Sequence, residues 1–515
     1  MTLMPHGQPP GLVEPGFGGF KRLYDADKPQ VVWTRLVADL ETPVSAFLKL
    51  ANDRPNSFLL ESVEGGAVRG RYSIIGFEPD LIWRATGEIA EINSSPTAKT
   101  SRYRRLAQAP LVSLRRLIAD SRIDLPEGLP PMAAGIFGYI GYDTVRLIEH
   151  LPAENPDPIG LPDSVLIRPT MIVIFDSVKD EITVVSPVRP NKKLSAKSAY
   201  ARAVDRLMQA VDRLEEPLPH LPDVDASKIV LAKPRSNTGP AAYKKMINKA
   251  KRYIRAGDVF QVVLSQRFST PFTLPPFALY RALRRTNPSP YLYYLNFGHY
   301  AVVGSSPEIL VRVRNGEVTI RPIAGTRPRG QNASEDKAHA KDLLADPKEC
   351  AEHLMLLDLG RNDAGRVAKI GTVEVTDSFF LEYYSHVMHI VSNVVAELDP
   401  KKDSIDALMG GFPAGTVSGA PKVRAMEIID ELEKDKRGIY AGCVGYFSAD
   451  GDMDSCIILR TSIVKDGVMY VQAGAGIVAD SVPASEQTEC INKARALFRA
   501  AEEAVRFASR AKRSQ

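Results

Sequence analysis

The chain has 515 residues, of which 44% are hydrophobic and 25% are charged, and its formal net charge is +5. These values are ordinary for a globular protein, but the length exceeds one simple core, so we expect several domains or one large composite. The mild charge, with bases mostly interleaved with acids, argues against a nucleic-acid groove.

The start of the chain and its cysteines indicate the compartment. The first twenty residues are rich in Gly and Pro and lack the apolar core of a secretory signal, so we expect a flexible arm over residues 1–29. No run of about 18 apolar residues exists that could cross a membrane. None of the cysteines forms a CxxC pair, which favours reduced thiols in a cytoplasmic protein. They are Cys350, Cys443, Cys456 and Cys490.

An N-terminal region is expected over residues 30–215. Short β-type runs such as SFLLESV and PTMIVIFDSV alternate there with helical stretches such as APLVSLRRLIADS. A polar helix over about 195–215 ends the region. Residues 216–240 contain prolines at 217, 219, 222, 234 and 240, which predicts a linker.

A second region is expected over residues 241–505, followed by a basic tail over 506–515. It begins with an amphipathic helix at about 241–256 and continues with strand signals, among them VFQVVLSQRFS, YLYYLNFG and EILVRVRNGEVTIRPIAG. Asn315-Gly316 is typical of a hairpin turn. Short turns without regular βαβ spacing predict an α+β fold of large, mostly antiparallel sheets with flanking helices.

Two Glu-x-x-Glu pairs lie near the starts of predicted helices. Asp346-Pro347 is a good helix start, and Glu349 and Glu352 then share one helix face. Glu486 and Glu489 fall in the first turns of the last helix. A capping box or solvated acids would explain each pair alone, whereas both pairs together would suit Mg²⁺. Spacing alone does not show that the pairs meet.

Two glycine-rich segments suggest nucleotide loops, but neither fits. Gly474-Ala475-Gly476 begins a GxGxxA pattern, yet Asp480, Ser481 and Pro483 interrupt the helix that a dinucleotide turn must open. Residues 410–422 lack the GK[ST] of a P-loop. The glycines of 474–476 therefore either offer backbone N–H groups to an anion or allow close packing.

Two polar residues lie in apolar surroundings. Arg460, in CIILRTSIV, is predicted within a buried strand and needs an anionic partner, either a core Asp or a substrate carboxylate. His386 and His389 would point to opposite faces of a strand, which excludes a paired metal site. Each is then a core histidine or an acid–base group.

These pieces occur in a familiar order. FQVVLSQRF (260–268), NPSPY (287–291), GSSPE (304–308), PIAGTRPRG (322–330), KECAEHLMLLDLGRND (348–363), HVMH (386–389), GTVSGAPK (415–422), YAGCVGYF (440–447), QAGAGIVADS (472–481) and SEQTECINKA (485–494) resemble the chorismate-utilising enzymes. The chain most closely resembles the anthranilate synthase component I family. ETPVSAF (41–47) and LLES (59–62) extend this similarity to the N-terminal region.

The resemblance implies a Mg²⁺-dependent lyase that converts chorismate and ammonia into anthranilate and pyruvate, the first committed step of tryptophan biosynthesis. Glu352 and Glu489 match the family's principal Mg²⁺ ligands, with Glu349 and Glu486 in support directly or through water. The remaining matched positions fall into two groups. Arg460 and Tyr440 would hold the pyruvyl carboxylate, Gly325, Thr326, Gly474, Ala475 and Gly476 would contact the substrate elsewhere, and His389 with Thr416 would assist departure of the C4 hydroxyl.

Two positions distinguish related activities. Ala324 stands where aminodeoxychorismate synthases carry a nucleophilic Lys, and Gln261 stands where isochorismate and salicylate synthases carry the Lys that activates water. Both favour ammonia as the nucleophile and anthranilate as the product. An enzyme that stops at aminodeoxyisochorismate remains an alternative.

The resemblance also implies a partner and an effector. No cysteine lies in the Gly-x-Cys-x-Gly turn of a glutaminase, so we expect a separate glutamine amidotransferase subunit (component II). A feedback site for L-tryptophan would comprise Glu61, Ser62, Pro290, Tyr291 and Leu292. Leu292 departs from the methionine typical of the family, a swap of similar volume.

Overall fold

The computed structural model describes residues 12–509 except 53, 65–67, 99, 153–154, 220–228, 230 and 385–386. All strands in these ranges belong to one hydrogen-bonded network, in which every pairing between them is antiparallel. The predicted α+β fold is confirmed. None of the described helices is both long and apolar enough to cross a membrane.

The helices of the described ranges come in two kinds. The α-helices are α1 Phe17–Asp25, α2 Pro43–Leu50, α3 Pro110–Asp120, α4 Ala196–Glu215, α5 Pro240–Ala256, α6 Pro276–Thr286, α7 Ala333–Ala345, α8 Pro347–Gly365, α9 Ser404–Gly411, α10 Lys422–Leu432 and α11 Pro483–Ser509. The 3₁₀ helices are η1 Pro131–Ala133, η2 Tyr142–Leu147 and η4 Gly415–Val417.

The strands share two long members that join the halves of the molecule. They are β1 Gln30–Val37, β2 Ser57–Glu64, β3 Val68–Thr86, β4 Ile89–Asn93, β5 Arg104–Arg105, β6 Gly135–Ile140, β7 Ser164–Asp176, β8 Glu181–Val188, β9 Arg235–Ser236, β10 Gln261–Pro271, β11 Tyr291–Asn296, β12 Tyr300–Ser306, β13 Ile309–Arg314, β14 Glu317–Ile320, β15 Ile323–Pro328, β16 Glu374–Tyr383, β17 Val387–Glu397, β18 Gly419–Ala420, β19 Cys443–Ser448, β20 Met453–Ile457, β21 Thr461–Lys465 and β22 Val468–Ile477.

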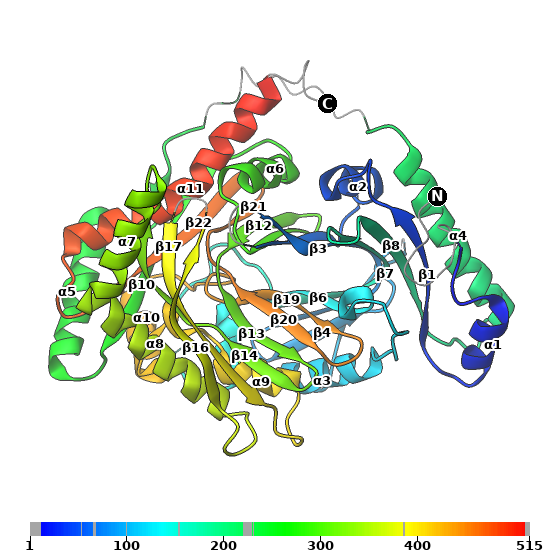
Figure 1. Ribbon diagram of the computed structural model, residues 1–515, viewed down its shortest axis with the longest axis horizontal. Helices are drawn as coiled ribbons and strands as arrows, with labels where there is room; N and C mark the ends of the chain where they lie inside the picture. The colour runs from blue at the N-terminus through cyan, green and yellow to red at the C-terminus, as the bar shows by residue number, and fades with distance from the viewer. Residues whose placement is uncertain are drawn as a thin grey trace.

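Two runs of strands form the two layers of the molecule (Figure 1). The first run is β1-β8-β7-β3-β2-β11-β12-β21-β22-β10, and the second is β4-β3-β7-β6-β19-β20-β13-β14-β17. Both contain β3 and β7, and the register of β3 shifts between Pro79 and Leu81. Such a bulge bends a strand, which allows β3 to pass from one run into the other.

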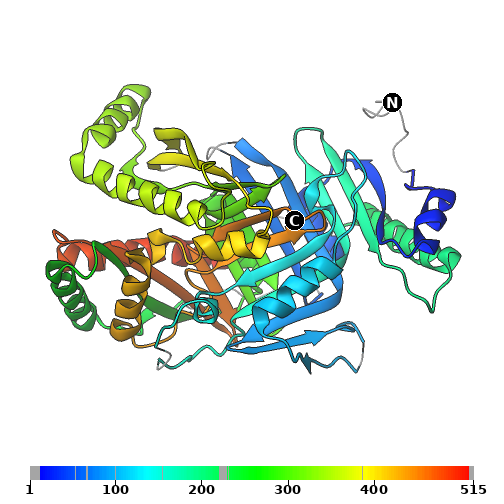
Figure 2. The same cartoon turned by 90° about the horizontal axis from the view of Figure 1, so that it is seen from below.

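The main hydrophobic clusters follow from this arrangement. One lies between the two runs and includes Phe58, Phe137, Tyr293 and Val444. A second lies under α2, α4, α5, α6, α10 and α11, which cover the outer face of the first run. A third lies under α3, α8 and α9 on the second run, and Figure 2 shows α3 and α9 on that lower face.

Several predicted elements are confirmed by the structure. Helix α4 begins where its cap Ser195 accepts a hydrogen bond from the Ser198 N–H, and α5 begins at Pro240. The Asn315-Gly316 turn joins β13 to β14, with both residues at positive φ as a type I′ turn requires.

The predicted flexible arm is wrong from Phe17 onward. Residues 17–25 form α1, in which Phe20 is fully buried and stacks at 5.1 Å against Tyr200 of α4. The Glu14 N–H and C=O also bond to Trp33. Burial of these aromatic rings against a distant helix orders a segment whose composition alone favours flexibility. Residues 1–11 lie outside the described part of the chain.

The predicted linker and tail also need correction at their edges. Arg235–Ser236 forms β9, which pairs with β10, while most of residues 220–230 lie outside the described ranges. Helix α11 continues to Ser509, so the basic tail begins as helix, and residues 510–515 are not described. The two predicted regions are also not separate sheets, because β2 pairs with β11 and β6 pairs with β19.

Candidate active site

The first acidic pair lies in the first turns of α8. Asp346 caps this helix by accepting hydrogen bonds from the Lys348 and Glu349 N–H groups, as predicted. The Glu349 carboxylate does not close a capping box; it forms an ion pair of 3.1 Å with Arg327. It also lies against Gly325, where a Cβ atom would come within 3.2 Å of it.

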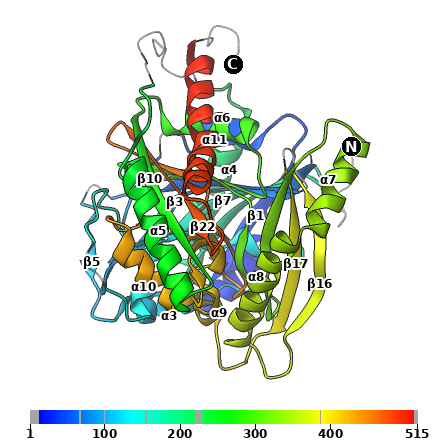
Figure 3. The ribbon, with the colours of Figure 1, turned by 90° about the vertical axis from the view of Figure 1, so that its left-hand side faces the viewer.

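The second acidic pair lies in the first turns of α11, and the two pairs converge. Burial raises the pKa of Glu352, and the charges of Glu349 and Glu489 raise it further. Burial likewise raises the pKa of Glu486, with a further contribution from Glu489. Figure 3 shows α11 beside β22 and α8 beside β17 on this side of the molecule. The spacing of the sequence could not establish this meeting of two helices.

Lys493, which the sequence interpretation overlooked, links the acidic pairs to the glycine strand. Its ammonium lies 2.7 Å from a Glu489 oxygen and donates to the Gly474 carbonyl at 3.1 Å. It also lowers the pKa of Glu352. Within the described ranges, no three His, Cys, Asp or Glu side chains form a group ready to hold a metal. Arg327 and Lys493 therefore occupy carboxylates that a cation could otherwise bind.

His389 lies on β17 opposite Thr326 of β15. Its Nδ1 atom is 2.9 Å from the Gly325 carbonyl oxygen and 3.1 Å from the Thr326 hydroxyl. Because a carbonyl oxygen only accepts, Nδ1 carries the proton and Nε2 keeps a lone pair. Burial lowers the pKa of His389 to about 4, so the ring is neutral at neutral pH. His386 lies outside the described residues.

Gly325 shapes this corner of the site through its backbone. Its φ of +68° lies in the left-handed region that favours glycine. A register shift between β15 and β17 occurs at the same point, between Ala324 and Thr326. The backbone there can therefore turn its carbonyl toward His389.

Arg460 is not within a strand, contrary to the prediction. It lies between β20 and β21 with φ +47°, an uncommon conformation for a residue with a side chain. Burial lowers the pKa of Arg460, while Tyr384 and Glu308 raise it. No hydrogen bond or ion pair from a described residue holds its guanidinium, so the core-Asp alternative is not realised. The group is available to an anionic ligand.

Glu308 is a second residue that the sequence interpretation missed. It follows β12 in the GSSPE motif and is 8% exposed. Burial raises the pKa of Glu308 to about 8, although Thr416, Arg460 and Lys493 lower it. The carboxyl group is therefore largely protonated at neutral pH. A single Glu after a strand gives no such signal in sequence, because its burial depends on distant elements.

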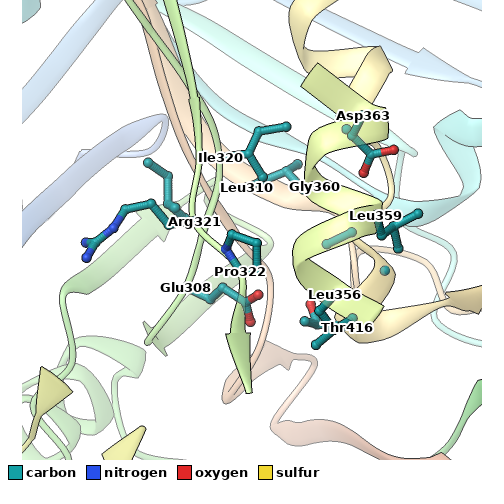
Figure 4. Close-up of a pocket in the computed structure, with 14 residues that line it drawn as sticks. Glu308, Leu310, Ile320, Arg321, Pro322, Leu356, Leu359, Gly360, Asp363 and Thr416 are labelled. Carbon is teal, nitrogen blue, oxygen red and sulfur yellow. The ribbon is translucent and has the colours of Figure 1, made fainter. Parts of the chain in front are cut away.

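Glu308 and Thr416 line one end of a cavity of about 370 Å³, its open mouth included. Figure 4 shows both residues at that end, with Asp363 of α8 at the other. The remaining wall is mostly apolar and includes Leu356 and Leu359. The Thr416 hydroxyl is buried and forms no hydrogen bond of normal geometry with a described residue. Two groups that can exchange protons thus face a nearly dry space.

Gly474, Ala475 and Gly476 lie within β22 and pair with β10. A Cβ at Gly474 would meet the Leu264 carbonyl at 2.8 Å and the Tyr440 hydroxyl at 3.1 Å. The glycine strand therefore packs closely on Tyr440, and its extended conformation confirms that it is no dinucleotide turn. Ala475 is fully buried in the opposite core, so only its backbone can face a ligand.

The predicted effector residues lie elsewhere, between the two strand runs. Ser62 pairs with Tyr291, and Glu61 pairs with Leu292. These four residues line a cavity of about 590 Å³, whereas Pro290 is not among its lining residues. The Glu61 carboxylate is already bound by Arg284 at 2.7 and 2.9 Å and by the Tyr280 hydroxyl.

Comparison with known proteins gives one consistent family. The family model of the chorismate binding enzyme matches residues 58–499. Anthranilate synthase component 1 of Cereibacter sphaeroides is 58% identical over 96% of this chain and 99% of its own. That of Pseudomonas aeruginosa is 49% identical over 90% of this chain and 94% of its own.

Solved structures agree. The anthranilate synthase component I from Streptococcus pneumoniae has a TM-score of 0.74 at 39% identity, covering 90% of this chain and 98% of that chain. The menaquinone-specific isochorismate synthase from Escherichia coli has a TM-score of 0.69 at 19% identity, covering 94% and 98%. At that identity the second comparison shows the shared fold alone.

Proposed function

The chain belongs to the anthranilate synthase component I family of chorismate-binding enzymes, and we propose that it converts chorismate and ammonia into anthranilate and pyruvate. One observation carries the proposal: the Arg460 guanidinium has no partner among the described residues and acts on the pKa of the buried Glu308 carboxyl. Chorismate offers a carboxylate for the first group and a hydroxyl leaving group for the second.

The acidic pairs supply the site for a cation. Glu352 and Glu489 would hold Mg²⁺, which prefers oxygen ligands and keeps several waters, and Glu349 and Glu486 would support it. Their convergence from two helices and their carboxylate-only chemistry fit this ion. Bound there, the cation would neutralise the ring carboxylate of chorismate.

The residues of the chain account for the proton transfers. Ammonia forms a bond to C2 while the C4–O bond breaks, and the protonated Glu308 gives its proton to the leaving oxygen, which departs as water. In the second stage the C2 proton is removed and the enolpyruvyl C–O bond breaks, releasing pyruvate. The neutral His389, with a free lone pair on Nε2, is the base that fits this stage.

The choice of ammonia over water or lysine follows from two buried side chains. Ala324 is 8% exposed and has no group to attack the ring. Gln261 is 3% exposed, lies against Gly476, and has a buried Oε1 atom without a hydrogen-bond partner among the described residues. That oxygen can accept an N–H of ammonia but cannot act as a general base.

The source of ammonia and the control of the enzyme are further parts of the proposal. A separate glutamine amidotransferase subunit would supply ammonia, because none of the four cysteines lies in the turn that a glutaminase needs. L-Tryptophan would inhibit the enzyme by binding in the cavity beside Glu61, Ser62, Tyr291 and Leu292.

The test is a turnover assay with the purified chain. Chorismate, Mg²⁺ and ammonium at alkaline pH should give the fluorescence of anthranilate, and glutamine should replace ammonium only after the partner subunit is added. Product analysis separates anthranilate from aminodeoxyisochorismate. Untouched chorismate in the presence of ammonium would refute the proposed reaction.

A further inference from the structure

An ion pair between Glu433 and Arg437 is buried close to the site but plays no part in the chemistry above. Arg437 is 3% exposed and Glu433 is 5% exposed. The guanidinium donates to both carboxylate oxygens, at 3.0 and 2.7 Å. Because desolvation makes such a pair costly, burial alone does not explain its presence as a source of stability.

The remaining donors of Arg437 bind the backbone of two other segments. One N–H donates to the Val417 carbonyl at 2.6 Å, and another donates to the Val263 carbonyl at 2.7 Å. Val417 directly follows Thr416 in η4, and Val263 pairs with Gly476 of the glycine strand. The Val263 N–H also donates to the Ser418 carbonyl at 2.9 Å. Arg437 thus joins the Thr416 loop to the strand beside the glycines.

Glu433 extends the same contact network along β10. One of its oxygens accepts from the Ser265 N–H at 2.7 Å and from the Ser265 hydroxyl at 2.9 Å. Ser265 pairs with Gly474. The ion pair therefore contacts β10 opposite both glycines of the predicted substrate-binding backbone.

Two aromatic rings complete the surroundings of the guanidinium. Its carbon lies 5.5 Å from the centre of the Tyr440 ring and 4.9 Å from that of Tyr142. The Tyr440 hydroxyl reaches Gly474. Tyr142 belongs to η2 of the N-terminal region, so this region packs directly on the same cation. A planar guanidinium can bind carboxylate, carbonyls and ring faces at once, which an ammonium cannot.

From these contacts we infer that Arg437 is a positioning residue, which holds the Thr416 loop, the Gly474–Gly476 backbone and Tyr440 in one arrangement for reaction. This inference rests on the proposed function of the site. Since a shift of about 1 Å in a reacting group can reduce turnover about 100-fold, loss of the fork should lower kcat strongly even in a folded protein.

The chain offers a matched control in Arg146. This residue of η2 donates to both oxygens of Asp430 at 2.7 Å and to Asp143 at 2.9 Å, and its side chain is 14% exposed. Its printed partners include no residue of the predicted active site. It therefore fastens the N-terminal region to α10 as Arg437 does, without contact to the Thr416 loop.

The experiment compares Arg437→Lys and Arg146→Lys for melting temperature, kcat, and the KM for chorismate. We expect both variants to melt somewhat lower, but only Arg437→Lys to lose kcat by about 100-fold. Arg437→Ala should regain activity with millimolar guanidinium chloride and not with sodium chloride. If Arg437→Ala does not fold, the split between kcat and melting temperature of the two Lys variants decides alone.

Two results would overturn the inference. One is a kcat of Arg437→Lys within threefold of the parent; the other is a loss of activity that follows the melting temperature equally in both Lys variants. A parent protein that forms no anthranilate would instead refute the proposed function. In that case the affinity for chorismate, measured by calorimetry on the same variants, still tests the arrangement.

Discussion

Glu308 combines burial, a raised pKa and a place beside Thr416, which makes it the strongest candidate for the proton donor. We expect Glu308→Gln to reduce kcat by about 10²- to 10⁴-fold, the usual contribution of general acid catalysis. Turnover of chorismate with ammonium measures it. Glu317→Gln, an exposed carboxylate on β14, is the control and should leave kcat unchanged.

The same residue predicts a pH dependence whose sign is fixed by its pKa of about 8. The active form is protonated, so activity should be full below this pKa and fall as the pH rises through it. The rate must be expressed per free ammonia, because ammonia itself becomes more abundant with pH. A profile without a falling limb near pH 8 would remove Glu308 as the acid.

Arg460 should determine affinity for the substrate and not the chemical step. Arg460→Lys keeps the charge but loses the fork, which costs about 1.5–3 kcal/mol for hydrogen bonds to a charged group. The KM for chorismate should rise roughly 10- to 100-fold. Steady-state kinetics test this, and an unchanged KM would mean that the guanidinium does not bind the substrate.

Glu489 should act through the metal. Glu489→Gln removes one carboxylate of the convergent pairs, and the apparent affinity for Mg²⁺ should fall by more than about tenfold. Magnesium titration of turnover, and of heat in calorimetry, measures it. Glu502→Gln, an exposed acid further along α11, should change neither value.

Residues whose role depends on their local helix were predictable, while those that depend on packing were not. Asp346-Pro347 predicts the start of α8 because capping is a matter of neighbouring residues. Glu308 acquires its raised pKa from elements far along the chain, so a single Glu in GSSPE gives no local sign of it. The family resemblance supplied the motif but not the environment.

At the scale of elements, one helix links the effector cavity to the acidic pairs. Helix α6 carries Tyr280 and Arg284, which bind Glu61 at the cavity, and α6 also packs on α11. Glu61→Gln would leave the Arg284 cation without its carboxylate. We expect inhibition by L-tryptophan to weaken more than about tenfold while kcat without tryptophan is kept.

Inhibition curves for this variant and for Arg281→Gln test the link. Arg281 lies one turn earlier on α6 and is exposed, so its loss should leave inhibition unchanged. Equal sensitivity to tryptophan in the parent and in Glu61→Gln would show that α6 does not carry the signal.

The elements themselves were predictable where their periodicity was strong. The starts of α4 and α5 and the β13–β14 hairpin follow from caps, prolines and Asn-Gly. Helix α1 and the break at Arg460 were not, because each depends on long-range packing. Phe20 is ordered by Tyr200, and the Arg460 backbone is held by the Ser305 N–H.

At the scale of the whole molecule, the two regions predicted from sequence form one folding unit. Strand β2 pairs with β11 and β6 pairs with β19, so hydrogen bonds cross between the regions at two places. The core between the runs is also shared, since Phe58 and Phe137 come from the first region and Tyr293 and Val444 from the second. A proline-rich connection in sequence does not reveal such pairing.

This sharing predicts that residues 241–515 do not fold alone, although they contain every residue assigned to catalysis. Removing residues 1–240 would leave β11 and β19 with unpaired edges and would expose the apolar side chains that now face the first region. Expressed alone, the fragment should aggregate, whereas coexpression with residues 1–240 should restore a folded, active complex. Sedimentation and circular dichroism distinguish these states. A monodisperse fragment with a cooperative melt and chorismate turnover would show that the shared sheet serves regulation and not folding.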